Sequence, residues 1–347
     1  MSGDGRVERL GASLEEPLLV TNPANLRYLT GFDSSNAALL VARDGVRLFA
    51  DFRYAVAGRA VPGVEFVETE RALFAGLARH LSGRIAFESD HLTYASYEML
   101  HAAGIELVAR SGLVEALRAV KEEAELETIR RAAAITSEAF AGFSRERFVG
   151  RTERELTWRM EELLHELGAQ GTAFPTIVAA GATGSTPHAR GGDREVEAGA
   201  TVVVDAGAIL DGYCSDCTRT FATGPLPDTL KEAYTVCLGA QLAALDAVRP
   251  GAVGREVDAV ARDRIAEAGF GEAFGHGLGH GVGVVVQEEP RLTQTSEQVL
   301  EPGNVVTVEP GIYLEGLGGI RIEDLVVVRD GEPEILTSFA KDLVSVE

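Results

Sequence analysis

Short apolar runs separated by turn residues make up the first third of the chain. The runs at residues 37–42 and 46–50 flank Asp44-Gly45, and such a dipeptide between apolar runs predicts a β-hairpin. Residues 24–31 end in a glycine, which predicts a turn or a short helix. Strands and helices then alternate, which indicates an α/β layer structure. The expected strands are residues 18–20, 37–42, 46–50 and 84–87, and the expected helices are residues 71–81 and 96–103.

Beyond about residue 118 the apolar positions recur with the longer period of amphipathic helices. Leu126, Ile129 and Ala133 fall at three- and four-residue spacing within a stretch rich in Glu, Ala and Arg. Thr152 and Glu155 form a capping-box pattern, which predicts the start of the next helix. The helices of this part are expected near residues 121–140, 152–167, 228–247 and 255–268, and its strands at residues 201–205, 305–309 and 320–328.

The length of the chain and this change of pattern both suggest two domains. At about 150 residues per domain, 347 residues are enough for two. Helices combined with separate strands are typical of an α+β domain. We therefore expect an α/β domain over residues 1–118 and an α+β domain over residues 119–347.

Charge and cysteine content exclude several classes of protein. There are 53 acidic residues against 32 Lys and Arg, a formal charge of -21, which argues against binding to nucleic acid or to an anionic membrane surface. No apolar run approaches the roughly 20 residues that span a bilayer, and we expect no signal peptide. Three cysteines cannot build a disulfide scaffold, so a cytoplasmic protein is expected.

Four acidic residues lie in contexts that are unusual for solvated surface carboxylates. Asp205 and Glu309 each end an apolar β-branched run, Glu323 lies among apolar residues, and Asp216 lies between two cysteines. Burying an unpaired carboxylate is costly, so several buried together require cations to neutralise them. Carboxylates with an imidazole suit divalent ions such as Mn²⁺, Co²⁺ or Zn²⁺, and four shared carboxylates can hold two of them.

A glycine-rich segment supplies the candidate imidazoles. His276 and His280 are four residues apart, but five glycines in residues 275–283 disfavour a helical zinc pair. Glycines instead let the backbone approach a site closely. The same segment also allows a reading as a dinucleotide loop, although no acidic ribose partner or following helix is evident. Cys214 and Cys217 are interpreted as small buried side chains, because no second cysteine pair exists to complete a zinc site.

In these segments the chain resembles the pita-bread metallopeptidases, in the branch that contains prolidase and Xaa-Pro aminopeptidase. The eleven-residue gap between Asp205 and Asp216 fits that family. The resemblance implies a creatinase-like α/β domain over residues 1–118 and a pita-bread catalytic domain over 119–347, in which a curved sheet backed by helices holds the metals. It rests on residues 25–32 and 51–54 in the first half, and on residues 185–188, 204–207, 212–220, 276–283, 308–313 and 321–324 in the second.

The resemblance also implies the identity of the metal ligands. By position, these are Asp205, Asp216, His280, Glu309 and Glu323. Asp216 and Glu323 resemble the family's bridging carboxylates, and Glu309 resembles the residue that takes a proton from the attacking water. Two divalent ions per chain are expected, Mn²⁺ first, with Co²⁺ and Zn²⁺ as alternatives.

Three further residues resemble the substrate-binding positions of the family. His188 matches the histidine that hydrogen-bonds the substrate at the scissile bond, and His276 matches a pocket histidine four residues before the ligand. Both are expected to act in catalysis. Gln287 stands seven positions after His280, where the family usually has histidine. Glutamine forms hydrogen bonds but carries no charge near neutral pH, which leaves the proline preference open.

The function implied is hydrolysis of a peptide bond near the end of a short peptide, with Xaa-Pro bonds as the leading choice. Such an enzyme is an Xaa-Pro aminopeptidase or an Xaa-Pro dipeptidase, and the resemblance implies a homodimer. One alternative is a metallopeptidase of the same fold with altered specificity, such as a carboxypeptidase. Another is creatinase-like C–N hydrolysis, which the presence of the ligand residues disfavours. A catalytically inactive peptide-binding relative is the alternative outside the enzymes.

Overall fold

The computed structural model describes residues 5–347, and these divide after Arg118 into two compact units, the second of which is Ala119–Glu347. The first unit is built on a six-stranded sheet in the order β4-β3-β2-β1-β5-β6. Its strands are β1 (Leu18–Val20), β2 (Ala37–Ala42), β3 (Gly45–Asp51), β4 (Glu65–Thr69), β5 (Arg84–Glu88) and β6 (Glu106–Arg110). Its helices are α1 (Arg6–Ser13), α2 (Pro23–Thr30), α3 (Ala55–Arg59), α4 (Leu73–His80), α5 (Tyr94–Ala102) and α6 (Leu113–Ala119).

The pattern of the sequence explains the local structure of this unit. α2 is capped by the Asn22 side chain and closed by Gly31, whose φ of 69° is readily adopted only by glycine. The expected hairpin forms, with β2 and β3 antiparallel. It turns one residue earlier than expected, at Arg43 and Asp44, because Gly45 already pairs with Ala42.

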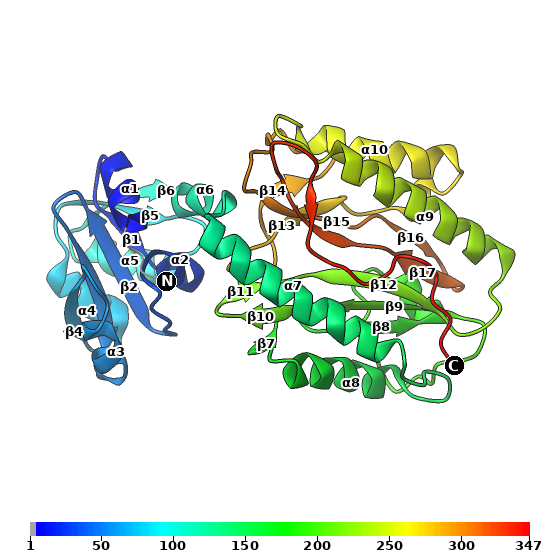
Figure 1. The fold of residues 1–347 in the computed structure, drawn as a ribbon. Helices are drawn as coiled ribbons and strands as arrows, with labels where there is room; N and C mark the ends of the chain where they lie inside the picture. Colours follow the sequence, from blue (N-terminus) through cyan, green and yellow to red (C-terminus); the bar gives the residue numbers. More distant parts are fainter. Residues whose placement is uncertain (1–4) are drawn as a thin grey trace. The chain divides into compact units, whose positions relative to one another are not determined.

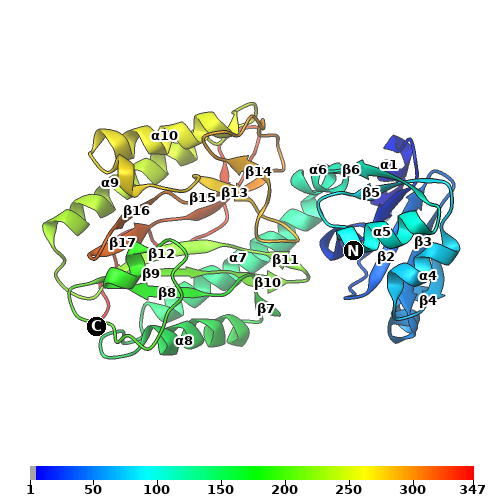
Figure 2. The same ribbon diagram turned by 180° about the vertical axis from the view of Figure 1, so that it is seen from behind.

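The second unit combines several small antiparallel sheets with four long helices, and Figure 1 and Figure 2 show the strands between the helices. Its sheets have the orders β12-β9-β8, β11-β10-β7, β14-β13-β15-β18-β19 and β16-β17. The strands are β7 (Gly171–Thr172), β8 (Ile177–Ala180), β9 (Thr201–Ala206), β10 (Ala208–Leu210), β11 (Tyr213–Cys214), β12 (Cys217–Ala222), β13 (Gly279–Gly281), β14 (Glu288–Leu292), β15 (Val305–Val308), β16 (Gly311–Leu314), β17 (Gly318–Arg321), β18 (Asp324–Val327) and β19 (Glu334–Ile335).

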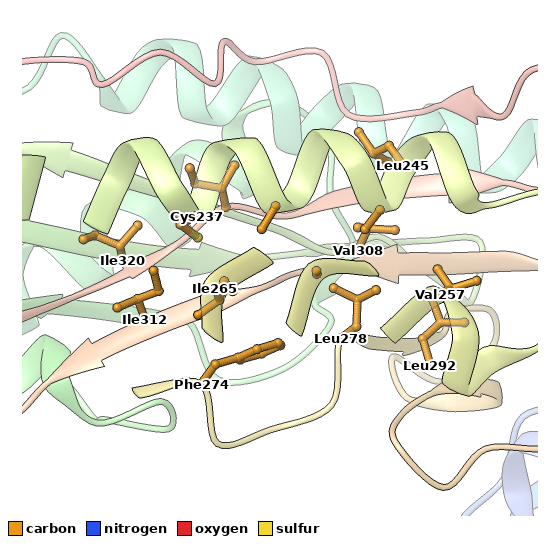
Figure 3. Close-up of a cluster of buried hydrophobic side chains, with 14 of the residues drawn as sticks. Cys237, Leu245, Val257, Ile265, Phe274, Leu278, Leu292, Val308, Ile312 and Ile320 are labelled. Carbon is orange, nitrogen blue, oxygen red and sulfur yellow. The ribbon is translucent and has the colours of Figure 1, made fainter. Parts of the chain in front are cut away.

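The helices cover these sheets in two pairs. α7 (Glu123–Phe143) and α8 (Glu153–Glu166) contact each other and the β8, β10 and β12 strands, whereas α9 (Asp228–Ala247) and α10 (Gly254–Glu267) lie side by side against β14 to β17. The expected capping box is present at the start of α8, where Thr152 and Glu155 bond each other's backbone. Figure 3 shows part of the core under α9 and α10, which includes Ile265, Val308 and Ile320. None of the helices in residues 5–347 is long and apolar enough to cross a membrane.

One expected strand proves to be two. The apolar run over residues 320–328 divides at Ile322 and Glu323 into β17 and β18, which belong to different sheets. The break occurs where the Glu323 backbone leaves the β17 pairing: its N–H donates to the Thr218 carbonyl (3.1 Å), and its own carbonyl accepts from Arg219. The chain therefore changes sheets at a carboxylate that the sequence analysis had singled out.

Candidate metal centre

Adjacent strands bring three of the predicted carboxylates together. Asp205 lies on β9 and pairs with Thr218 of β12, and Asp216 comes just before β12 begins. Glu323 joins them because its backbone N–H bonds to Thr218. One oxygen from each of the three carboxylates lies within 4.8 Å of the others. Asp216 is 5% exposed and Glu323 is 1% exposed, whereas Asp205 is partly exposed, so the cluster is largely buried but accessible from one side.

The three carboxylates destabilise one another as long as no cation lies between them. Burial, followed by the charges of Glu323 and Asp205, raises the pKa of Asp216 well above its ordinary value. The pKa of Glu323 is raised in the same way, by burial and by the charges of Glu309 and Asp205. Two oxygens, Asp205 Oδ1 and Glu323 Oε1, are buried with no hydrogen-bond partner. Hard oxygen donors left unpaired in a shared buried space fit a divalent cation.

His280 and Glu309 form a second pair at the same centre. His280 Nε2 lies 3.2 Å from Glu309 Oε1 and 3.8 Å from Asp216 Oδ2. Burial alone would raise the pKa of Glu309, but the hydrogen bond and charge of His280 lower it to about 2. Thr307 supports both residues, since its hydroxyl donates to Glu309 Oε1 (2.9 Å) and accepts the His280 N–H (3.0 Å). All five predicted ligand residues therefore lie at one centre, with an imidazole nitrogen added to the carboxylates.

The glycines around His280 are required by close backbone packing. A Cβ at Gly279 would lie 2.0 Å from the Thr307 carbonyl oxygen, and one at Gly281 would lie 2.2 Å from that of Glu289. The chain here forms β13, with a register shift between His280 and Gly281 where it pairs with β14. The segment is thus a strand wedged between two others, which excludes both a helical zinc pair and a dinucleotide loop followed by a helix.

Arg321 connects the carboxylate cluster to the rest of the site. Its guanidinium donates to Asp205 Oδ2 (2.6 Å), Thr218 Oγ1 (3.0 Å) and the Tyr313 hydroxyl (2.9 Å), and also to the Pro187 carbonyl. The Thr218 hydroxyl in turn donates to Glu323 Oε2 (2.7 Å). A fully buried cation therefore partly neutralises the cluster and fixes the orientation of two of its members.

The two predicted pocket histidines differ in their surroundings. His276 Nδ1 lies 2.8 Å from the Gly277 carbonyl, so it carries the proton, and Nε2 then accepts from the Tyr313 hydroxyl at 3.0 Å. Burial lowers the pKa of His276, which keeps the ring neutral. His188 is exposed at the wall of the cleft. Both histidines line a cleft of about 550 Å³ that also reaches Asp205, Asp216, His280 and Glu309.

Gln287 also lines this cleft, together with two arginines. These arginines are Arg190 and Arg291. Apolar side chains form another part of the wall: Phe174, Pro175, Ile177 and Val286.

Three hydroxyl groups outside the predicted site residues hold the site together. Thr218, Thr307 and Tyr313 each bond one of the predicted residues directly. Thr218 follows Asp216 by two residues, and Thr307 precedes Glu309 by two residues. Tyr313 follows Glu309 by four residues. Alternation along a strand places residues two apart on one face, and this signal was available from the sequence.

Comparison with known proteins agrees with this geometry. Residues 127–330 match the metallopeptidase family M24, and residues 6–120 match the creatinase/prolidase N-terminal domain. An uncharacterized peptidase of Bacillus subtilis, YqhT, is 38% identical over 94% of this chain and 95% of its own length. The solved structure of an Xaa-Pro dipeptidase from Bacillus anthracis has a TM-score of 0.94 at 36% identity, covering 99% of this chain and 100% of that one.

A second similar solved structure is that of a protein named for a different activity. The X-Pro aminopeptidase from Thermotoga maritima superposes with a TM-score of 0.89 at 34% identity, covering 98% of this chain and 100% of that one. The expected fold class, a creatinase-like α/β domain followed by a pita-bread catalytic domain, is confirmed by these matches. The chain belongs to the metallopeptidase family M24 and is a metal-dependent peptidase.

Proposed function

We propose that the protein is a dinuclear exopeptidase that hydrolyses short peptides, with Xaa-Pro bonds as its preferred substrates. The observation that carries this proposal is the buried carboxylate cluster with two unpartnered oxygens, which opens onto a cleft lined by His188 and His276. The names of the similar solved structures, an Xaa-Pro dipeptidase and an X-Pro aminopeptidase, support the choice of bond.

Five residues would hold the two ions: Asp205, Asp216, His280, Glu309 and Glu323. We propose Mn²⁺ as the native metal, with Co²⁺ and Zn²⁺ as alternatives, because oxygen donors predominate and one imidazole is present. When bound, the ions supply Lewis-acid activation of the scissile carbonyl and make water a competent nucleophile near neutral pH.

The chain's own groups would handle the proton and the substrate. Glu309 is held by Thr307 and His280 at the centre, so its carboxylate is placed to accept a proton from the attacking water. His188 is free to donate a hydrogen bond to the substrate at the scissile bond. His276 is neutral and already accepts from Tyr313, so it would orient this part of the pocket through a fixed tautomer.

The cleft also supports a restriction to short peptides. Arg190 and Arg291 line the cleft and give it positive charge, which suits the free C-terminal carboxylate of a di- or tripeptide. The apolar wall formed by Phe174 and Ile177 suits a proline ring. A carboxypeptidase would also use such arginines, and this remains the second candidate.

A peptide panel tests the proposal. Metal-free enzyme is supplied with Mn²⁺, Co²⁺ or Zn²⁺ and given an Xaa-Pro dipeptide, an Xaa-Pro tripeptide and versions blocked at either end, with products read by mass spectrometry. We expect two ions per chain and cleavage of the Xaa-Pro bond in peptides with a free N-terminus. Cleavage only of N-blocked peptides would favour the carboxypeptidase, and neither metal binding nor hydrolysis would favour a peptide-binding protein.

Gln287→His is expected to raise kcat/KM for Xaa-Pro substrates below about pH 6.5, where an exposed histidine becomes charged. A hydrogen bond from a charged donor is worth about 1 kcal/mol more than one from a neutral donor, which corresponds to roughly a fivefold gain. The matched control is Gln294→His, on an exposed position outside the cleft. An equal gain in both variants would contradict a role for position 287 in binding the substrate.

We further propose a homodimer and a cytoplasmic location. The dimer rests on the family resemblance and would be tested by the sedimentation mass of the purified protein. The location is supported by the buried thiols of Cys214, Cys217 and Cys237, none of which forms a disulfide bond in residues 5–347, which agrees with a reducing compartment.

A further inference from the structure

A second charged cluster lies directly behind the carboxylate centre, around Asp324. This residue follows Glu323 in the chain and is fully buried. Its Oδ1 accepts from Arg219 Nη2 (2.9 Å) and Thr337 Oγ1 (2.8 Å), and its Oδ2 accepts from Gln241 Nε2 (2.9 Å) and Lys341 Nζ (2.7 Å). Arg219 and Lys341 therefore both form ion pairs with this one carboxylate.

Arg219 connects this rear cluster to the metal centre. Besides Asp324, its guanidinium donates to the backbone carbonyls of Glu323 and of Thr218 (3.0 Å). Its remaining hydrogen bonds go to the carbonyls of Phe339 (2.7 Å) and Ala340 (3.0 Å). The peptide that carries the Glu323 side chain is thus held from behind by a buried arginine, and that arginine is held by Asp324 and by the end of the chain.

The residues that complete the rear cluster come from the segment 337–341, which lies beyond the 127–330 match to the peptidase family. The segment is tied down on both sides, since Tyr234 Oη donates to the Lys341 carbonyl (2.8 Å) and the Ser338 N–H donates to Ser137 Oγ (2.9 Å). Two cations face the one carboxylate of Asp324, which leaves Arg219 able to bond the Glu323 carbonyl as well.

We propose that the segment 337–341 is a positioning element for the metal centre, in which Lys341 and Thr337 fix Asp324 so that Arg219 holds Glu323 in its binding orientation. The inference rests on the proposed function, in which Glu323 is a metal ligand. It assigns a role to a part of the chain that neither touches the cleft nor belongs to the family match.

Positioning and simple electrostatics predict opposite effects for the loss of Lys341. Removing a positive charge close to a cation site strengthens cation binding if charge alone matters. If Lys341 acts by position, its loss leaves Asp324 to draw Arg219 away from the Glu323 carbonyl, and the cation binds more weakly. Loss of residues that orient metal ligands typically costs 10–100-fold in metal affinity.

The test compares Lys341→Met, Lys341→Arg and Thr337→Val with the wild type. Mn²⁺ binding to metal-free protein is measured by calorimetry, and kcat and KM are measured on an Xaa-Pro dipeptide. We expect Lys341→Met and the charge-neutral Thr337→Val to weaken Mn²⁺ binding about tenfold, and Lys341→Arg to restore most of the affinity. The control is Lys231→Met, at an exposed lysine of α9 whose carboxylate partner is Asp228.

The outcomes separate this inference from the proposed function. Unchanged or tighter Mn²⁺ binding in Lys341→Met, with normal binding in the wild type, overturns the positioning role and leaves the peptidase assignment intact. Failure of the wild type to bind Mn²⁺ overturns both. Thermal unfolding of the metal-free variants shows whether any lost affinity reflects misfolding, and Thr337→Val still tests the inference if Lys341→Met does not fold.

Discussion

Asp216→Asn is expected to abolish measurable hydrolysis while making the metal-free protein more stable. Loss of metal-centred charge stabilisation costs several kcal/mol in the transition state, which corresponds to a fall in kcat/KM of about a thousandfold. The gain in stability follows from the raised pKa of Asp216, whose charge is unfavourable beside Glu323 and Asp205 in a buried space. Asparagine keeps the size of the side chain and removes that charge.

Two measurements on purified protein check this expectation. Melting of the metal-free variant should occur about 2–4 °C above the wild type for each kcal/mol of repulsion relieved, and added Mn²⁺ should no longer raise it by the wild-type amount. Asp246→Asn, at an exposed carboxylate of α9, is the matched control and should change neither property. Near-normal activity of Asp216→Asn with metal present would refute the assignment of this residue as a ligand.

Arg321→Met is expected to have the second largest effect on activity. Unlike Asp216→Asn, it is expected to lower the stability of the metal-free protein. Arg321 is 4% exposed and bonds Asp205, Thr218, Tyr313 and the Pro187 carbonyl. Removing one partner of a buried ion pair costs about 3–5 kcal/mol, because the other charge stays buried without compensation. Activity should also fall 10–100-fold, since Asp205 and Glu323 lose the group that orients them.

Denaturant unfolding of Arg321→Met, Arg321→Lys and wild type, each with and without Mn²⁺, separates these effects. Lysine keeps the charge but cannot bond four acceptors in a fixed plane. We therefore expect Arg321→Lys to recover part of the stability and little of the activity. Because bound Mn²⁺ can neutralise Asp205, it should stabilise Arg321→Met more than it stabilises the wild type. A loss of stability below 1 kcal/mol in metal-free Arg321→Met would show that this ion pair is not required.

Periodicity and capping predicted the helices well, since their signals are local. The pattern of Leu126, Ile129 and Ala133 and the capping box at Thr152 specify α7 and the start of α8 without reference to any other part of the chain. The break between β17 and β18 has no such signal. Ile320 and Ile322 read as one continuous apolar strand, and what separates them is the contact of the Glu323 backbone with Thr218 and Arg219, about a hundred residues away.

In the candidate site, too, the features with local sequence signals could be predicted, and those that depend on contacts between distant segments could not. The four acidic residues and His280 could be selected from their unusual local context and from a family resemblance, and the structure brings them together. The rear cluster could not be selected, because two of its pairs join distant segments: Arg219 and Asp324 are 105 residues apart, and Gln241 and Asp324 are 83 apart. Thr337 and Lys341 are only 13 and 17 residues from Asp324, but they lie outside every element and motif that the sequence indicates. Nor could the sequence show that the Tyr313 hydroxyl donates a hydrogen bond to His276 Nε2, because this bond depends on where β16 places the phenol ring.

The neighbouring carboxylates Glu323 and Asp324 also have a consequence for folding. Glu323 contributes to the metal centre, and Asp324 begins β18 opposite Val308 and points into the rear cluster. A slip of one residue between β15 and β18 would exchange the faces of the two side chains. It would bury the longer carboxylate among Arg219 and Lys341 and send the shorter one toward the metal centre. Consecutive acids with different lengths and different buried partners therefore help to specify the register between β15 and β18.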